Sequence, residues 1–315
     1  MNTATLDHAL PRNAGEPRPA AHDRDVLRGL LQPLFKVDPL LTGAGLGLLL
    51  LLPIFGALLA LDPRMVMGAP VWLKPAKFAL STAIYSLTLA WVFTYIPQWP
   101  ATRRIVGRVT ASVMLVEVAV IAVQAFRGTT SHFNVATAFD AALFSIMGIA
   151  IASQTISTVA VAIALWRNPF ADAAMGWALR AGMTITIMGA SVGGLMTAGP
   201  TPAQLAEIKA TGRITVVGAH TVGGPDGGPG LPGVGWSTRH GDLRVPHFFG
   251  LHAIQALPLF ALLLRRRPHP RNVSVVQTAA CLYALLFVFL LAEAQMGIPL
   301  LNLAPDLQVV SGGGR

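Results

Sequence analysis

A glutamate stands inside one of the most apolar stretches of this chain. Glu117 lies within Ala111–Phe126, which is almost wholly apolar up to Gln124. A carboxylate near the middle of a membrane helix costs about 2.5–3.5 kcal/mol on insertion scales, so such a residue usually faces the bundle interior and has a function there. Glu117 is therefore the first candidate for acid–base or proton chemistry.

Further ionisable residues map to the same side of the membrane as Glu117. Carboxylates and histidines are the usual general acids and bases, and arginine binds anionic groups through charge-assisted hydrogen bonds. The cytoplasmic half of the predicted bundle offers only arginines, tryptophans and scattered hydroxyls. We therefore predict an outward-facing polar cavity. Its catalytic candidates are Glu117, Arg127, His132, Asp140, His252 and Glu293.

Polar side chains near these residues are candidates for binding a substrate. Lys77, Ser81 and Tyr85 recur at helical spacing, and a polar stripe in a membrane helix faces other helices or water. Lys77 and Ser81, one turn apart, also fit a Ser–Lys dyad, although a lysine that reaches the membrane surface has the same pattern. The other candidates for binding are Gln124, Asn134, Asp242, Arg244, His247 and Gln255.

Histidines raise the alternative of a metal or haem site, with His132, His247 and His252 as candidate ligands. His247 and His252 are five residues apart, a poor spacing for one metal on a regular helix, so a ligand from elsewhere in the chain would be needed. The sequence signatures of a Walker loop, a zinc protease and a c-type haem site are absent. The cofactor stays unknown, with haem or a transition metal as one alternative.

The composition is that of a polytopic membrane protein. Hydrophobic residues make up 53% of the chain and charged residues 12%, and the mean hydropathy is +0.59. Several apolar stretches reach the roughly 20 residues that a bilayer core of about 30 Å requires. We predict an all-α bundle of about seven transmembrane helices. Their expected bounds are Leu40–Leu61, Phe78–Ile96, Ile105–Phe126, Asn134–Trp166, Ala174–Ala198, Val245–Leu264 and Val273–Glu293.

The basic residues predict an orientation. Of the 23 Lys and Arg, 14 fall on the side of the N-terminus and nine on the other side, four of the nine in one long loop. The positive-inside rule then places the N-terminus in the cytoplasm and the C-terminus outside a plasma (inner) membrane. Residues 1–39 are expected to be a disordered cytoplasmic tail with an interfacial helix, residues 40–298 the transmembrane domain, and residues 299–315 an extracytoplasmic tail.

The longest segment between spans, residues 199–245, is expected to have structure of its own. The sequence TPAQ combines an N-cap, a proline at the first helical position and a capping box, so Pro202–Thr211 should be a helix that ends at Gly212. Arg213–Val222 has strand-like β-branched content, and the Gly/Pro-rich run after it excludes regular structure. We expect this segment to form a lid over the polar cavity.

Three classes of function fit this pattern. The first is a membrane protein that binds or chemically processes a small apolar or lipidic substrate, with Glu117 or Glu293 as acid or base and a histidine as proton shuttle. The second is a proton-coupled transporter that uses Glu117, although the sequence shows no inverted repeat and no polar path to the cytoplasmic face. The third is a haem or metal protein.

The expected partners are the lipid bilayer and a small-molecule or lipid ligand. The formal charge of +9 comes mainly from basic residues at helix ends, which topology and lipid headgroups require, so a nucleic-acid partner is not expected. The one cysteine, Cys281, lies in an apolar helix and cannot form an internal disulfide. The sequence does not identify the reaction, the ligand or the oligomeric state.

Overall fold

The computed structural model describes residues 21–227 and 230–302. Residues 1–20 of the predicted N-terminal tail and residues 303–315 of the predicted C-terminal tail lie outside this described part. The helices are α1 (Ala21–Val37), α2 (Pro39–Leu50), α3 (Leu52–Leu61), α4 (Leu73–Phe93), α5 (Pro100–Phe126), α6 (Ala138–Arg167), α7 (Ala173–Met196), α8 (Pro202–Thr211), α9 (Arg244–Leu251), α10 (Ala253–Arg265) and α11 (Asn272–Gln295). The short strands β1 (Met65–Val66) and β2 (Ala69–Pro70) pair with each other, and β3 (Thr221–Val222) pairs with β4 (Gly241–Asp242).

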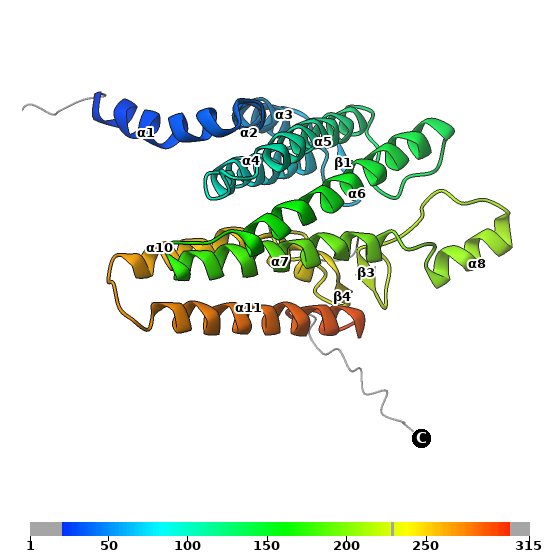
Figure 1. Ribbon diagram of the computed structural model, residues 1–315. Helices are drawn as coiled ribbons and strands as arrows, with labels where there is room; N and C mark the ends of the chain where they lie inside the picture. Colours follow the sequence, from blue (N-terminus) through cyan, green and yellow to red (C-terminus); the bar gives the residue numbers. More distant parts are fainter. Residues whose placement is uncertain (1–20, 228–229, 303–315) are drawn as a thin grey trace, which may run out of the picture.

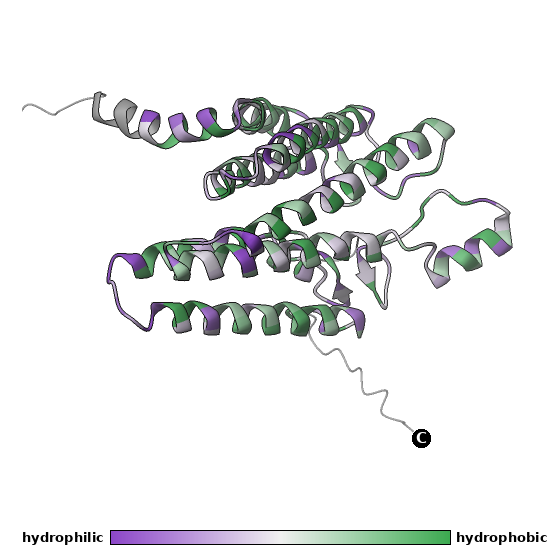
Figure 2. Ribbon diagram, in the orientation of Figure 1, coloured by the Kyte–Doolittle hydropathy of each residue, from purple (hydrophilic) through white to green (hydrophobic). Residues whose placement is uncertain are grey.

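The fold is an all-α polytopic bundle, as predicted. In the described residues six helices are long and apolar enough to cross a membrane, with α2 and α3 counted as the one span Pro39–Leu61. A seventh span results if the bent pair α9–α10 is counted. Figure 2 shows the apolar colour along these helices and hydrophilic colour at several of their ends. The surface position predicted for a helix in the N-terminal tail stays a prediction, although a helix, α1, is present there.

The spanning helices form two groups joined by α6 (Figure 1). The first group, α2–α5, and the second group, α7 and α9–α11, lie on either side of α6, which packs against both α5 and α7. The segment 197–243 lies at one end of the bundle, which we call the loop end. The connections 94–99 and 266–271 lie at the other end, which we call the opposite end.

Two large apolar clusters occupy most of the interior, and a third, small one consists of Val120, Ile121 and Met147. The larger one joins both helix groups, with Leu41 and Phe93 from the first and Leu179 and Leu257 from the second. The second large one belongs to the first group alone and includes Leu48, Phe55, Val71 and Met114. The two groups therefore share one apolar cluster, and the first group has a second cluster of its own.

Side-chain caps set where several spans begin. Asp38 Oδ1 accepts from the backbone N–H of Leu41 at 2.9 Å ahead of α2. Thr137 Oγ1 accepts from the N–H of Asp140 at 3.1 Å ahead of α6. The predicted start of this span at Asn134 is therefore wrong, because the threonine three residues later provides the cap that satisfies a free N–H.

The span predicted over Val245–Leu264 corresponds to the bent pair α9–α10 and is not one straight helix. The chain bends by 42° between α9 and α10, with His252 at the break. Thr186 of α7 stabilises the break: its Oγ1 donates to the carbonyl of Leu251 at 3.4 Å and accepts from the N–H of Ile254 at 3.2 Å. These bonds satisfy backbone groups that the interrupted helix leaves free.

Close backbone packing holds α9 against α7. A Cβ atom added at Gly189 would lie 2.5 Å from the Cα of Gly250, so neither position has room for a side chain. Gly193, one turn further along α7, is less tightly packed, because its added Cβ would meet only His247 Cε1 at 3.7 Å. Small residues permit such close approaches in membrane bundles.

The segment after α7 confirms the helix predicted over Pro202–Thr211. Thr201 and Gln204 form the capping box, and Gly212 ends the helix with a left-handed φ of 68°. The predicted strand Arg213–Val222 is mostly irregular: Thr221–Val222 is its only strand in the described residues, and Val216 makes an isolated bridge to Asn134. This segment therefore returns to the bundle beside the connection between α5 and α6.

Candidate functional site

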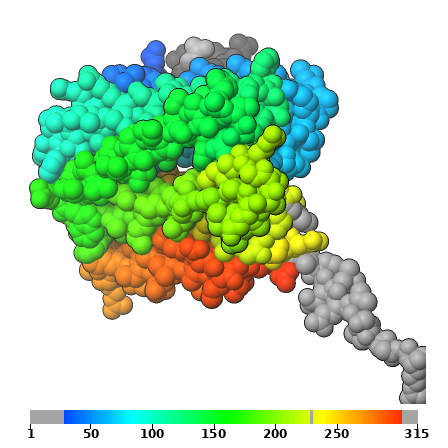
Figure 3. All heavy atoms as spheres, turned by 90° about the vertical axis from the view of Figure 1, so that its right-hand side faces the viewer, coloured from blue at the N-terminus to red at the C-terminus, as the bar shows by residue number. Residues whose placement is uncertain are grey.

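Lys74 and His132, both half-buried, form the centre of a polar group at the loop end. Seen from this end, a narrow recess separates the green surface of α6 from the yellow-green surface of the loop segment (Figure 3). Lys74 Nζ, on the first turn of α4, lies 3.2 Å from Nδ1 of His132 in the α5–α6 connection. An ammonium can only donate, so Nδ1 accepts and the ring proton lies on Nε2. His132 therefore presents an N–H donor on its other side.

Glu117 lies on α5 close to Lys74, so that the two charges interact. Only 1% of Glu117 is exposed, and neither of its carboxyl oxygens has a hydrogen-bond partner. A buried carboxyl group without a partner loses the hydration that it has in water and gains no bond in exchange. Such a group is usually retained in a membrane bundle for a function.

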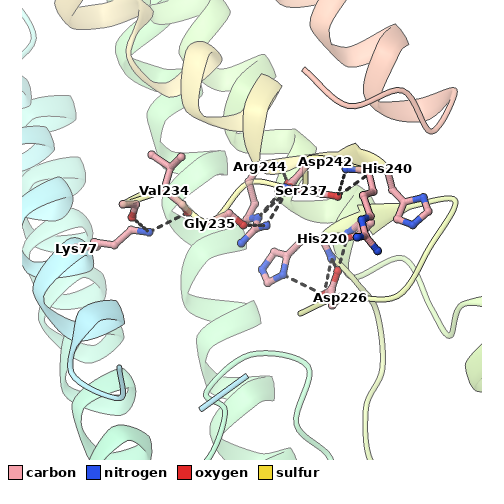
Figure 4. Close-up of polar contacts among 12 residues, drawn as sticks. Lys77, His220, Asp226, Val234, Gly235, Ser237, His240, Asp242 and Arg244 are labelled. Atoms are coloured by element: carbon pink, nitrogen blue, oxygen red, sulfur yellow. Dashed lines mark hydrogen bonds and ion pairs between the residues drawn. The ribbon is translucent and has the colours of Figure 1, made fainter. Parts of the chain in front are cut away.

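His220 reaches the same region from the loop segment. Its Nδ1 lies 3.1 Å from Asp226 Oδ2, and its backbone N–H donates to the same carboxylate (Figure 4). Although burial opposes it, hydrogen bonds from His220 hold the pKa of Asp226 below its ordinary value of 3.8. The His220 ring packs edge-on against Phe133 with the ring centroids 4.8 Å apart. Asp226 thus fixes both the backbone and the ring of His220.

His247 of α9 completes the group. Its Nδ1 lies 2.7 Å from the carbonyl oxygen of Gly189, so Nδ1 donates and a neutral ring has a free acceptor at Nε2. Burial, followed by repulsion from the Lys74 ammonium and from His220 and His247 when they are protonated, holds the pKa of His132 well below its ordinary value of 6.5. We call Lys74, Glu117, His132, His220 and His247 the Lys74 cluster.

Aromatic rings wall the Lys74 cluster. The His132 ring lies between Phe78 and Phe133, with ring centroids 5.7 and 6.3 Å away. Phe133 also meets Phe144 of α6 at 5.8 Å. Few polar groups within apolar and aromatic walls are the usual composition of a small-molecule site.

The predicted residues Arg127, Asp140 and Gln124 form a separate group. Arg127 Nη1 lies 2.5 Å from Asp140 Oδ1 and also donates to Gln124 Oε1. Thr137 Oγ1 donates to the other Asp140 oxygen at 2.6 Å, and Gln124 Nε2 donates to Oδ1 at 2.8 Å. Arg127 thus binds Asp140 and Gln124 through Nη1, and within the described residues no hydrogen bond or ion pair joins it to the Lys74 cluster. Asn134 is bonded locally, to Thr129 Oγ1 at 3.0 Å.

Lys77 and Ser81 do not form a Ser–Lys dyad. Lys77 Nζ donates to the carbonyls of Gly233 and Val234, each at 3.1 Å, and Figure 4 shows the lysine reaching from α4 toward this part of the loop segment. Ser81 is exposed. Lys77 therefore attaches the loop segment to the first helix group. Elsewhere on α4, Tyr85 Oη lies 3.4 Å from Thr158 Oγ1 of α6.

Asp242 and Arg244 are paired with each other. Arg244 donates to Asp242 from Nε at 2.9 Å and from Nη2 at 2.6 Å, and to the Gly235 carbonyl at 2.6 Å (Figure 4). The backbone N–H of Ser237 donates to Asp242 at 2.8 Å. The pair thus fixes the end of the loop segment. Glu293 lines a narrow cavity together with Asp242 and Val245.

His252 and Gln255 lie at the break between α9 and α10. The His252 ring is 4.3 Å from Phe248, which meets Trp236 of the loop segment at 5.4 Å. Gln255 Nε2 lies 3.4 Å from Thr88 Oγ1 of α4. No described hydrogen bond or ion pair joins His252 to Arg127, His132 or Asp140, so these four predicted residues belong to three different groups.

The described residues contain no group of three or more His, Cys, Asp or Glu side chains placed to hold a metal ion. The candidates His132, His247 and His252 each have a different partner: Lys74, the Gly189 carbonyl and Phe248.

Lys74, His220 and Asp226 are absent from the residues that the sequence predicts for the site. Lys74 stands three residues before the predicted Lys77, which shares its helix but contacts a different element. His220 lies in the segment predicted to be a lid, where spacing along the chain carries no information about contacts.

Comparison with known proteins finds no matching family model, curated protein or solved structure.

Proposed function

We propose that this membrane protein binds a small apolar or lipidic molecule with a polar group at the Lys74 cluster, and holds that group between Glu117, Lys74 and His132. One observation carries the proposal: the Glu117 carboxyl is 1% exposed and both oxygens are without a hydrogen-bond partner. A ligand hydroxyl or amine would supply the missing donor. The Nε2–H of His132 and the Lys74 ammonium would contact an electronegative atom.

The surroundings of the cluster support an apolar ligand body. Phe78 and Phe133 flank the His132 ring. A groove between α5 and α6 is lined mainly by apolar residues, among them Val113, Val116 and Ile149, and would suit an acyl chain. We further propose that, in a reaction of the bound molecule, the Glu117 carboxyl group acts as acid or base and the Nε2–H of His132 donates a proton.

The protein purified in native nanodiscs tests binding. Organic extracts analysed by mass spectrometry should contain a molecule that is reduced at least fivefold in Glu117→Gln and in Lys74→Met. The matched control is Glu293→Gln, which also removes a carboxylate but lies in a different cavity. Equal amounts of every extracted molecule in all four preparations would contradict the proposal.

We also propose the orientation that the basic residues predict: the loop end outside and the N-terminus in the cytoplasm of an inner membrane. Cys281 is exposed and would first be replaced by alanine. Impermeant maleimide added to intact cells should then label Ser237→Cys in the loop segment and leave His269→Cys at the opposite end unlabelled. The reverse result would overturn this orientation.

A further inference from the structure

The first helix group contains a row of buried polar side chains that extends from Glu117, which the proposed binding site also uses, toward the opposite end. α2, α4 and α5 pack against one another. Between Glu117 and the opposite end, their buried residues include hydroxyls and one more carboxylate. The members of this row, which we call the polar column, are Asp38, Thr42, Ser86, Thr110 and Glu117, each less than 9% exposed.

Contacts place the two ends of the polar column. Asp38 Oδ2 lies directly against Gly107 of α5, where an added Cβ would collide with it. On α5, Gly107, Thr110 and Glu117 are three and seven residues apart and lie within one arc of the helix. At a rise of 1.5 Å per residue, Thr110 is about 4.5 Å beyond Gly107, and Glu117 about 10.5 Å beyond Thr110.

Polar atoms without partners lie along this line. Thr110 Oγ1 is fully buried and unpartnered, as are both oxygens of Glu117. The other two hydroxyls of the column bond within their own helices: Thr42 Oγ1 donates to the Asp38 carbonyl at 2.7 Å, and Ser86 Oγ donates to the Thr82 carbonyl at 2.8 Å. A threonine that only filled space would donate to the carbonyl four residues earlier, as Thr82 does to Phe78 at 2.7 Å. Thr110 makes no such bond, so its hydroxyl is free to accept and donate.

We propose that the polar column conducts protons between Glu117 and the opposite end of the bundle. A protonated Glu117 releases its proton to intervening water, the Thr110 hydroxyl accepts it while donating its own, and Asp38 takes it up before releasing it to the aqueous phase. One proton moves, and the negative charge passes from Asp38 to Glu117. Basic side chains near the column are Lys74 at the loop end and, at the opposite end, Lys36, two residues before Asp38, and Arg108, next to Gly107.

Liposomes containing the full chain and a pH-sensitive dye test the proposal. A potassium gradient with valinomycin drives protons inward, and the wild type should carry a flux above that of protein-free liposomes. Thr110→Val should reduce this flux at least fivefold, since valine keeps the shape and removes the hydroxyl. Thr110→Ser should retain it. Thr155→Val, on α6 away from the column, is the matched control and should conduct like the wild type.

Two results would overturn the proposal: a wild-type flux no larger than that of protein-free liposomes, or an unchanged flux in Thr110→Val. Should Thr110→Val not fold, Asp38→Asn makes the same test. Proton conduction and ligand binding share Glu117, but the two experiments can give opposite results. Thr110→Val should keep the extracted ligand whether or not protons pass, whereas Glu117→Gln should lose both.

Discussion

Lys74 Nζ donates to His132 Nδ1 across 3.2 Å, from the first turn of α4 to the connection between α5 and α6. This contact fixes the His132 tautomer with its proton on Nε2. It also keeps the ring beside a positive charge, which opposes a second proton. The neutral histidine is thus a consequence of the fold.

Acidification should destabilise the protein through His132. Its pKa is well below 6.5 in the folded state, so below that pH the unfolded chain binds more protons and stability falls with falling pH. The melting temperature should drop between pH 7 and pH 5, and drop less in His132→Asn, whose amide oxygen still accepts from Lys74. His269→Asn, at an exposed position, is the control. Identical pH profiles for both variants and the wild type would refute this role.

A methyl group at Gly189 should separate α7 from α9. Its Cβ would lie 2.5 Å from a backbone atom, which cannot rotate away. We expect Gly189→Ala to lower the free energy of unfolding by about 1–3 kcal/mol, as overpacking does. Gly193→Ala, where the Cβ would meet only His247 Cε1 at 3.7 Å, should be close to neutral. Denaturant unfolding of both variants in detergent makes the comparison, and equal losses would count against the close packing.

The Arg127–Asp140 pair should stabilise the fold without affecting the ligand. Removing one partner leaves the other without its bond, at a cost of about 1–3 kcal/mol. Arg127→Met and Asp140→Asn should each lower the melting temperature, and the double variant should lose less than the sum of the two. The amount of extracted ligand should equal that of the wild type. Loss of ligand in a stably folded Arg127→Met protein would place this group in the binding site after all.

Asp226 should hold the loop segment against the bundle. It accepts from His220 Nδ1 and from the backbone N–H groups of His220 and Thr221. Asp226→Asn keeps the size of the side chain and removes its charge, so the segment should open and be cut faster by a protease. Glu207→Gln, on helix α8, tests whether any lost carboxylate in the segment has this effect. Equal cleavage rates in the two variants would contradict the anchoring role.

The class of fold was predicted well from the sequence, and so were the elements whose ends are set by local signals such as caps. The spans follow from apolar length alone, and α8 follows from a capping box and a glycine that lie within a few residues of each other. The start of α6 was misplaced by four residues, because several polar residues precede it and only the folded chain shows that Thr137 caps it.

The candidate site was predicted only in part. Glu117 stands out because a carboxylate in an apolar run is unusual, and the structure leaves it buried and unbonded. Lys74 and His220 were missed, since their importance comes from contacts between residues 58 or more positions apart, such as Lys74 with His132. Arg127 and Arg244 were predicted to be available for anions, yet each has a carboxylate partner that spacing alone does not reveal.

The position of α6 between the two helix groups has a mechanical consequence. In the described residues it is the helix that packs extensively on both groups, which meet otherwise in the shared apolar cluster. At the loop end, Lys77 of the first group donates to two carbonyls of the loop segment. A change in the angle between the two groups would therefore have to be accommodated at α6, and spin labels on α4 and α9 would register it as a change in distance.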